Sequence, residues 1–297
     1  MDFWMIGVSA ALGSAASWAG GAILFKRLGE HLSSPAMTWA KSIISVVLLA
    51  IVLFVIGFEP ISWPTFWLLI GSGILGIALG DTFFFEALRH LGAHAVVVLL
   101  MLGQVFTIAL AVLWLGERPT LPVWSGIALV LAGIWIVLRA KLAAESESEE
   151  EKKLKWRGVL FGLLSVLCMS VSIIIAKEAL DAVSAMQATF IRMLAGMAGM
   201  LVLGMGIGQL KQWVEPFASP KLAVHFILAV CVITFGGFWL SLVAIKYVDV
   251  SVANTLIATE PLFVLPLAAI FLKEKITPSA LLGSAVVVLG IGLIFLG

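Results

Sequence analysis

The chain has 297 residues, of which 62% are hydrophobic and 12% are charged. Polar side chains are too few to cover a soluble domain of this length, so the composition indicates a membrane protein. A net charge of +1 provides no basic face for nucleic acid, which excludes that class of partner.

Apolar runs of roughly 20 residues, the length that a helix needs to cross a bilayer, recur along the chain. The breaks between them carry charge, proline or glycine, as connecting segments do. The N-terminus lacks the basic start of a cleaved signal peptide, so we expect the first run to remain as a span. We predict an all-α integral membrane protein with ten transmembrane helices, near residues 4–25, 36–57, 65–88, 93–115, 121–138, 158–176, 184–207, 222–245, 250–272 and 279–296.

A charged segment without an apolar face, RAKLAAESESEEEKKLKWR at residues 139–157, lies in the middle of the chain. Acids and bases alternate in it, which is typical of a solvated connector. We therefore expect a first five-helix repeat at residues 1–140, a charged linker at 141–156 and a second five-helix repeat at 157–297.

The two halves are related in sequence. A shift of 151 residues, and from the third span onward a shift of 157, aligns residues of the same kind: Gly7 with Gly158, Lys26 with Lys177, Thr38 with Thr189, Lys41 with Arg192, Gly80 with Gly237, Leu88 with Ile245, Gly126 with Gly283 and Gly133 with Gly290. Because each half has an odd number of spans, the halves must cross the bilayer in opposite senses. The sequence thus predicts two inverted five-helix repeats, an arrangement common in secondary transporters.

Two segments carry a resemblance to a known family. QVFTIALAVLWLGERPTLPVWSGIALVLAGIWIV (104–137) and PLFVLPLAAIFLKEKITPSALLGSAVVVLGIGLIF (261–295) resemble the two copies of the EamA-type repeat of the drug/metabolite transporter superfamily. The shared feature is an apolar helix that ends in a Leu-Gly-Glu-Arg-like turn, followed by a glycine-punctuated helix. The first copy fits at Leu115–Arg118, and the second departs at Lys273, where glycine is expected.

This resemblance implies ten helices around a central cavity and transport by alternating access. It also implies a small-molecule substrate, with relatives that export amino acids and other metabolites or move sugars and nucleotide-sugars.

One predicted span contains a carboxylate and two prolines, Glu260, Pro261 and Pro266. A carboxylate at the centre of a span costs roughly 2.5–3.5 kcal/mol on insertion scales, so it is retained where it faces protein, water or a partner. The prolines remove backbone donors, which is tolerated at membrane depth beside a cavity or a neighbouring helix. We predict that Glu260 lines a substrate cavity; the alternative is a hydrogen bond between helices, with prolines that only kink the span.

Asp81 follows Gly76 and Gly80, whose small side chains permit close packing, and is the second cavity candidate. A hydrogen bond between helices is again the alternative. The remaining candidates could supply hydrogen bonds or aromatic surface, and ordinary helix packing is their alternative: Gln104, Asn254, Trp18, Trp239, Ser17 and Thr259.

Lys41 and Arg192 occupy equivalent positions near the starts of the second and seventh spans. Long basic side chains either reach back to the membrane interface or pair with acids at a gate. Their equivalence favours a gating or structural role, a group in which we also place Pro261 and Pro266.

The sequence favours a transporter over an enzyme, because its acids are scattered over distinct spans. It contains no HExxH or Walker A motif, and we expect neither a metal nor a cofactor. We expect a secondary transporter of the inner or plasma membrane that exports amino acids or related metabolites, with coupling to protons through a buried carboxylate as an option. The alternatives are a carrier for uptake or exchange of sugars or nucleotide-sugars, and a membrane scaffold that transports nothing.

The orientation has two options. The positive-inside rule places both termini outside, because the loops on their side hold only Arg118, Lys177 and Lys246. The family resemblance implies cytoplasmic termini.

Overall fold

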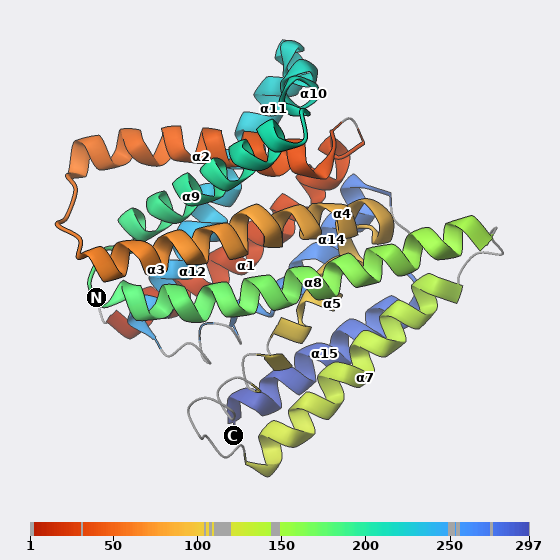
Figure 1. Ribbon diagram of the computed structural model, residues 1–297. Coiled ribbons are helices and arrows are strands. Elements are labelled where there is room, and N and C mark those ends of the chain that lie inside the picture. Colours follow the sequence, from red (N-terminus) through yellow and green to blue (C-terminus); the bar gives the residue numbers. More distant parts are fainter. Residues whose placement is uncertain are drawn as a thin grey trace.

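The computed structural model describes residues 3–30, 32–103, 105–106, 109, 120–143, 149–248, 253, 256–273 and 276–296, and almost all of them are helical (Figure 1). The first half contains α1 (Phe3–Leu28), α2 (Ser34–Ile56), α3 (Trp63–Gly73), η1 (Ile74–Asp81), α4 (Thr82–Leu91), α5 (Ala93–Leu100) and α7 (Leu121–Ala143). The second half contains α8 (Glu149–Leu180), α9 (Ala185–Gly206), α10 (Leu210–Val214), η2 (Glu215–Ala218), α11 (Pro220–Cys231), η3 (Val232–Trp239), α12 (Leu240–Tyr247), α14 (Glu260–Phe271) and α15 (Pro278–Leu296).

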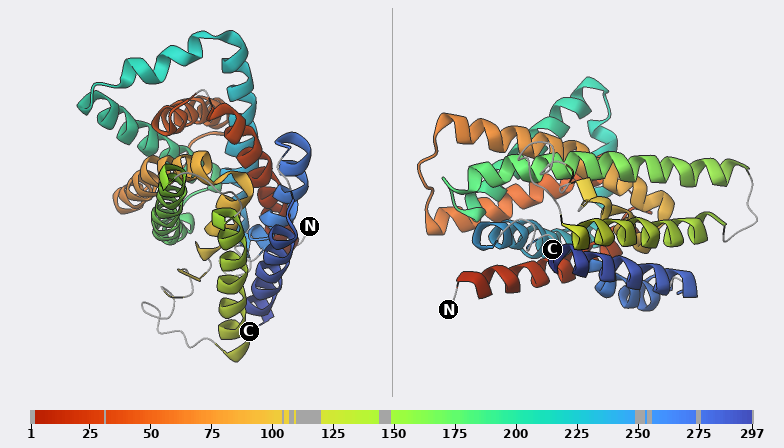
Figure 2. Two further views of the ribbon diagram at one scale, coloured as in Figure 1. Left: turned by 90° about the vertical axis from the view of Figure 1, so that its right-hand side faces the viewer. Right: turned by 90° about the horizontal axis from the view of Figure 1, so that it is seen from below.

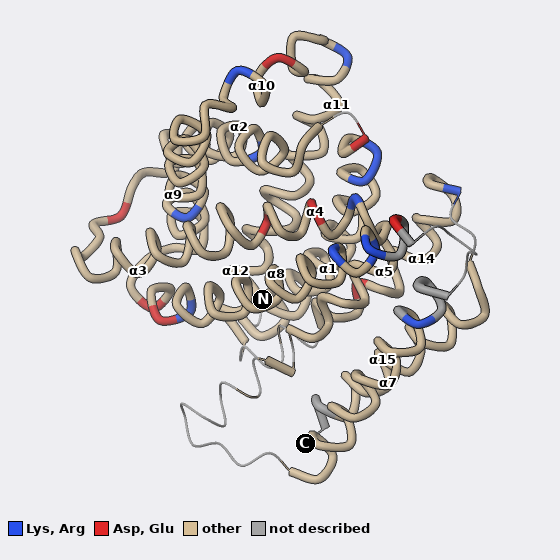
Figure 3. The backbone as a smooth tube through the Cα atoms, turned by 45° about the vertical axis from the view of Figure 1, so that its right-hand side comes forward, with Lys and Arg blue, Asp and Glu red and all other residues tan. Residues whose placement is uncertain are grey.

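Within these ranges, six helical segments are long and apolar enough to cross a membrane: Phe3–Leu28, Ser34–Ile56, Trp63–Leu91, Lys153–Leu180, Ala185–Gly206 and Pro220–Tyr247. Three shorter apolar helices fall in the predicted fifth, ninth and tenth spans. Of the predicted fourth span, the structure describes α5 and a few residues after it. Figure 3 shows most charged residues at helix ends and in connections, with long uncharged stretches of helix between them. The fold is that of a multi-pass helical membrane protein.

The third span of each half contains a π-helical segment. α3, η1 and α4 form one continuous helix with η1 at its centre, and α11, η3 and α12 do the same around η3. A shift of 157 residues carries Ile74–Asp81 onto residues 231–238, within one residue of η3. Such segments often mark functional sites, because they re-aim side chains and loosen the helix.

A break in the helix occurs at equivalent points of the predicted fourth and ninth spans. Met101 forms a turn after α5, and Ala258 and Thr259 form a turn before α14; a shift of 157 aligns Met101 with Ala258. Pro261 is the second residue of α14, where an N–H group has no helical acceptor in any case. Pro261 therefore starts a helix and does not interrupt one, unlike Pro266, which lies inside α14.

Each half packs against the other through the same contacts. Ser14 Oγ on α1 donates to the carbonyl of Gly237 at 3.1 Å, and Ser165 Oγ on α8 donates to the carbonyl of Gly80 at 2.9 Å. Ser14 and Ser165 are related by the shift of 151, and Gly80 and Gly237 by the shift of 157. Seven residues before these serines, Gly7 lies beside Tyr247 and Gly158 lies beside His90. In each pair of helices, the residue numbers therefore rise along one helix as they fall along the other. α1 thus runs antiparallel to the third span of the second half, as α8 does to that of the first.

The lysines that the alignment pairs form equivalent hydrogen bonds. Lys26 Nζ donates to the carbonyl of Leu88 at 3.0 Å, and Lys177 Nζ donates to the carbonyl of Ile245 at 2.7 Å. Each lysine lies at the end of the first helix of its half and binds the end of the third. Cations at helix C-termini are favourable, because they interact with the negative end of the helix dipole. α1 and the third span of its half therefore run parallel, and the same holds for α8.

α7 and α15 form a separate antiparallel pair at the edge of the bundle (Figures 1 and 2). Their glycines contact one another crosswise: Gly133 packs on the backbone of Gly283, and Gly290 packs on the backbone of Gly126. The alignment pairs Gly126 with Gly283 and Gly133 with Gly290, so this crossing is what a two-fold axis between the helices produces. Small residues let two membrane helices approach closely, which is why glycine recurs here.

Candidate functional site

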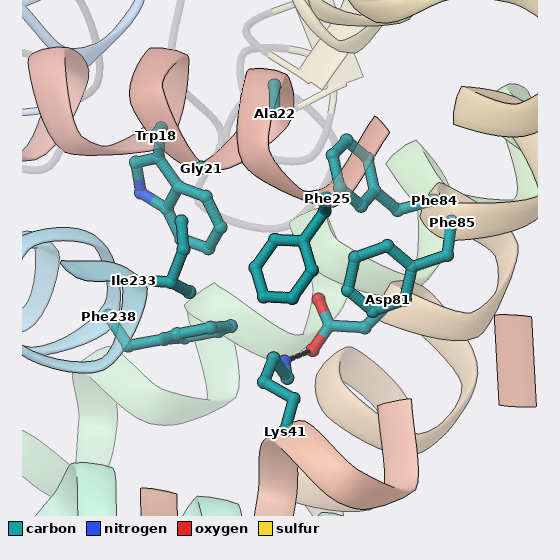
Figure 4. A pocket seen from close by; sticks show the side chains of 10 residues that line it. All are labelled: Trp18, Gly21, Ala22, Phe25, Lys41, Asp81, Phe84, Phe85, Ile233 and Phe238. Atoms are coloured by element: carbon teal, nitrogen blue, oxygen red, sulfur yellow. Dashed lines mark hydrogen bonds and ion pairs between the residues drawn. The ribbon is translucent and has the colours of Figure 1, made fainter. Parts of the chain in front are cut away.

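Five helical elements meet around a small interior pocket (Figure 4). Its wall consists of Trp18, Gly21, Ala22 and Phe25 of α1, Lys41 of α2, Asp81 of η1, Phe84 and Phe85 of α4, and Ile233 and Phe238 of η3. Both halves of the chain contribute, and both π segments do. The room for water-sized molecules is about 10 Å³, the space of roughly one water molecule, so in this conformation the pocket is closed to anything larger.

Lys41 and Asp81 form an ion pair in the wall of this pocket (Figure 4). Each residue is only 1% exposed. Opposite charges persist in such apolar surroundings because each compensates the other. Lys41 therefore does not reach back to the interface but pairs with an acid. Its role at a gate stays a prediction.

Aromatic rings surround the ion pair. The ammonium of Lys41 lies 4.3 Å from the centroid of the Phe238 ring, a distance at which the ring face attracts a cation. Phe238 in turn meets Trp18 edge to face, with 4.7 Å between centroids. Beyond Asp81, Phe25 packs against Phe85 at 5.0 Å. The pocket is thus a charged pair inside an aromatic cage.

Arg192 lies on α9, at the position that Lys41 has on α2, and is 6% exposed. Its Nη2 donates to Ser172 Oγ at 3.0 Å, whereas Nε has no hydrogen-bond partner among the described residues. Gly76 of η1 leaves space for Ser172, because a Cβ there would clash with the hydroxyl oxygen that binds Arg192. The backbone of Arg192 packs against Gly73, in the same continuous helix as Asp81.

Glu260 is the first residue of α14 and is 7% exposed. Within the described part of the chain, its side chain forms no hydrogen bond or ion pair. A negative charge in the first turn of a helix is favourable to the helix dipole. α14 packs against α1, α5 and α15, and Glu260 lines neither pocket described here. The structure therefore does not bring Glu260 and Asp81 together in one pocket.

The other predicted residues are spread over several environments. Trp18 lines the closed pocket, and its Nε1 donates to Ser241 Oγ at 3.2 Å. Ser17 donates to the carbonyl of Gly13 at 2.8 Å, and Thr259 donates to that of Leu256 at 2.7 Å, so both hydroxyls are bound within their own segments. Gln104 and Asn254 lie outside the described residues.

Trp239 lines a second, larger pocket of about 650 Å³ near the beginning of α1. Its other walls come from the end of α2, the start of α9 and from α12, with Ser9, Ser184 and Lys246 as polar side chains. Along α1, this pocket involves Ile6 to Ala10, and the closed pocket begins at Trp18. Between them, Ser14 Oγ lies 2.7 Å from Ser241 Oγ and links α1 to α12.

Among the residues of the closed pocket that sequence reasoning missed are Gly21, Ala22, Phe25 and Ile233. The pair of small residues at 21 and 22 was a usable signal, because Gly21 packs directly on the side chain of Ile233. The described residues contain no cluster of three histidine, cysteine or acidic side chains that could hold a metal ion.

This geometry defines a class: a multi-pass membrane protein whose related helical halves enclose a buried charged pocket. The chain belongs to the EamA-like transporter family, whose model matches residues 5–139 and again residues 156–296. The resemblance stated from the sequence is thereby confirmed, including its occurrence in two copies.

Two relatives support the same assignment. The chain is 32% identical to an uncharacterized transporter, YvbV, of Bacillus subtilis (strain 168) over 136 residues. This match covers 45% of each of the two chains. The chain is 26% identical over 198 residues to an uncharacterized transporter of Archaeoglobus fulgidus, covering 65% of this chain and 64% of the relative. The matches thus span about half to two thirds of these relatives. One protein of known crystal structure shares the fold with a TM-score of 0.65 at 15% identity, over 98% of this chain and 96% of that one.

Proposed function

We propose that this protein is a secondary transporter that moves a small metabolite by alternating access, with amino acids as the first candidate substrates. Ten spans in two inverted repeats, at residues 1–140 and 157–297 around a linker at 141–156, form the carrier. The first helix of each half packs antiparallel to the third span of the other half, which supports this arrangement. Ser14 and Ser165 form the equivalent hydrogen bonds at these two contacts. We place the carrier in the inner or plasma membrane, with export as its direction.

The observation that carries the proposal is the Lys41–Asp81 ion pair in the closed pocket. An amino acid is a zwitterion and offers a carboxylate to Lys41 and an ammonium group to Asp81. Such a ligand replaces one buried ion pair by two charge-assisted contacts, so each side chain keeps a partner while the substrate is bound. The aromatic rings of Trp18 and Phe238 exclude water around these contacts and strengthen them.

The access route follows from the two pockets. The larger one can admit a metabolite, and the closed one has room for about one water molecule. Along α1, Ser14 lies between them and meets Ser241 of α12, which also accepts a hydrogen bond from Trp18 of the closed pocket. In the proposed cycle this hydrogen-bonded contact between α1 and α12 opens to admit the substrate, and the contact of Ser165 on α8 with the carbonyl of Gly80 opens to release it.

Glu260 is the proposed carrier of a coupled proton. It is buried, lies at a helix break and forms no hydrogen bond to a described residue, so its protonation breaks no hydrogen bond within the described part of the chain. A carboxylate with these properties in a membrane protein is a functional candidate.

A sugar or nucleotide-sugar carrier is the second candidate, because aromatic rings such as Trp18 and Phe238 can stack on sugar faces. A neutral sugar offers no charge to the ion pair, which favours the amino acid. The test is counterflow into liposomes that contain the purified full-length protein, with parallel panels of L-amino acids, sugars and nucleotide-sugars. Exchange of sugars alone supports the second candidate. Absence of exchange in every panel, with no ligand-dependent rise in Tm, refutes the carrier and leaves a membrane scaffold.

A further inference from the structure

The two halves duplicate the buried base but not the acid. The shift of 151 residues pairs Lys41 with Arg192, and the shift of 157 pairs Asp81 with Phe238. The first half therefore supplies a base and an acid to the centre of the protein, and the second half supplies a base and a phenyl ring.

This asymmetry leaves a charge imbalance. Lys41, Asp81 and Arg192 are at most 6% exposed, and Arg192 packs against Gly73 and Gly76 in the same continuous helix as Asp81. Together the three side chains carry one positive charge in excess. An arginine side chain does not lose its proton in proteins, so the excess persists. Ser172 gives Arg192 a neutral partner, and Nε of Arg192 remains an unused donor among the described residues.

Glu260 does not supply the missing negative charge in this conformation. It lies on α14, which packs against α1, α5 and α15, whereas Arg192 lies on α9, which packs against α2, α3 and η1. Asp81, the acid within reach, is already paired with Lys41. A buried cation without a counter-ion among the described residues is strongly unfavourable at membrane depth, and its retention points to an anion that binds there.

We infer that the missing counter-ion is a second carboxylate of the substrate, and that the protein carries acidic amino acids in preference to neutral ones. This inference rests on the proposed transport function and narrows its substrate class. L-glutamate has one ammonium group and two carboxylates, which match Asp81, Lys41 and Arg192 one to one. The planar guanidinium of Arg192 suits the planar carboxylate, because several N–H groups can donate to it at once.

The test compares L-glutamate with L-glutamine, which differ in one carboxylate. Purified full-length protein is titrated with each at constant ionic strength, and the rise in Tm gives the two Kd values. We expect the wild type to bind L-glutamate at least about tenfold more tightly, the value of one charge-assisted hydrogen bond. R192Q is expected to bring the ratio close to one, while R192K, which keeps the charge, retains part of the preference.

Phe238→Asp tests the same point without removing Arg192. It places an acid at the position equivalent to Asp81, so the protein itself supplies the missing counter-ion. The preference for L-glutamate is therefore expected to fall in F238D as well. Elution as a single symmetric peak in size-exclusion chromatography establishes that each variant is folded. If R192Q does not fold, F238D gives the result.

Three outcomes overturn the inference. The first is equal affinity of the wild type for L-glutamate and L-glutamine, and the second is an unchanged ratio in R192Q and F238D. The third is saturable stabilisation by chloride that L-glutamate does not exceed, which assigns the site to an inorganic anion. Counterflow distinguishes a failure of this inference from a failure of the proposed transport function. If the protein exchanges neutral amino acids but not L-glutamate, only this inference is refuted. If it exchanges no solute, transport itself is refuted.

Discussion

Lys41 of α2 and Asp81 of η1 form an ion pair where two membrane helices cross, and neither side chain reaches water. Removal of one partner leaves a buried charge without compensation, so D81N and K41M are each expected to destabilise the protein by roughly 3–5 kcal/mol. The double variant K41M/D81N loses both charges together and is expected to be less destabilised than the two single effects added.

Thermal unfolding of the three variants in one detergent measures these effects as shifts in Tm. The comparison is made without added substrate, so that ligand binding does not enter. Additive shifts in the double variant would contradict a coupled pair.

Gly290 and Gly292 on α15 give a matched pair of substitutions. A Cβ at Gly290 would lie 2.7 Å from the carbonyl oxygen of Gly126, whereas nothing lies within 4 Å of a Cβ at Gly292. G290A is expected to force α7 and α15 apart and to cost about 1–3 kcal/mol, as overpacking does. G292A is expected to leave Tm unchanged. Equal Tm values for both variants would show that the crosswise glycine contact does not hold the two helices together.

If the halves are inverted repeats, the ends of their equivalent helices α1 and α8 lie on opposite faces of the membrane. Arg27 follows Lys26 at the end of α1, and Asp181 follows the end of α8, and both side chains are exposed. In a background without Cys168 and Cys231, R27C and D181C are expected to react with an impermeant maleimide from opposite sides. Labelling in right-side-out and inverted vesicles measures this. Reaction of both cysteines from the same side would refute inverted repeats, and the side of R27C also selects between the two orientations of the termini.

Glu260→Gln separates proton coupling from exchange. If Glu260 carries the proton, E260Q loses accumulation driven by a pH gradient and keeps counterflow, because exchange needs no net proton movement. Glu86 serves as the control: it accepts from Ser34 Oγ at 2.7 Å at the end of a span, and E86Q is expected to keep both activities. The measurement is uptake into liposomes with and without an imposed gradient. Unchanged accumulation and unchanged pH dependence in E260Q would remove Glu260 from the mechanism.

The sequence predicted much of the fold because its strongest signals are periodic and repeated. Length and hydropathy located the long helices. The alignment paired Lys26 with Lys177 and Leu88 with Ile245, and in the structure Lys26 binds Leu88 as Lys177 binds Ile245. The π segments were not predicted, because η1 and η3 have the composition of ordinary apolar helix and the extra residue per turn is a product of packing.

The site was predicted in part, since a residue type reveals chemistry but not its partner. Asp81 and Lys41 were both selected from the sequence, yet their pairing depends on how α2 crosses η1. Pro261 was expected to interrupt a helix and instead starts one, because the chain turns at Ala258 and Thr259. Burial of Phe25 and Ile233 in the same pocket is a contact between distant segments that local patterns do not encode.

A carrier made of inverted repeats changes sides when its halves exchange conformations, and identical halves would make the two end states equal in energy. Asp81 has Phe238 as its counterpart, so the two halves of this protein differ at the pocket: one supplies an acid and the other a ring. If the protein is the carrier proposed above, its two end states then differ in energy, and the empty form rests with a bias toward one face of the membrane. A substitution at Asp81 or Phe238 is expected to shift that bias.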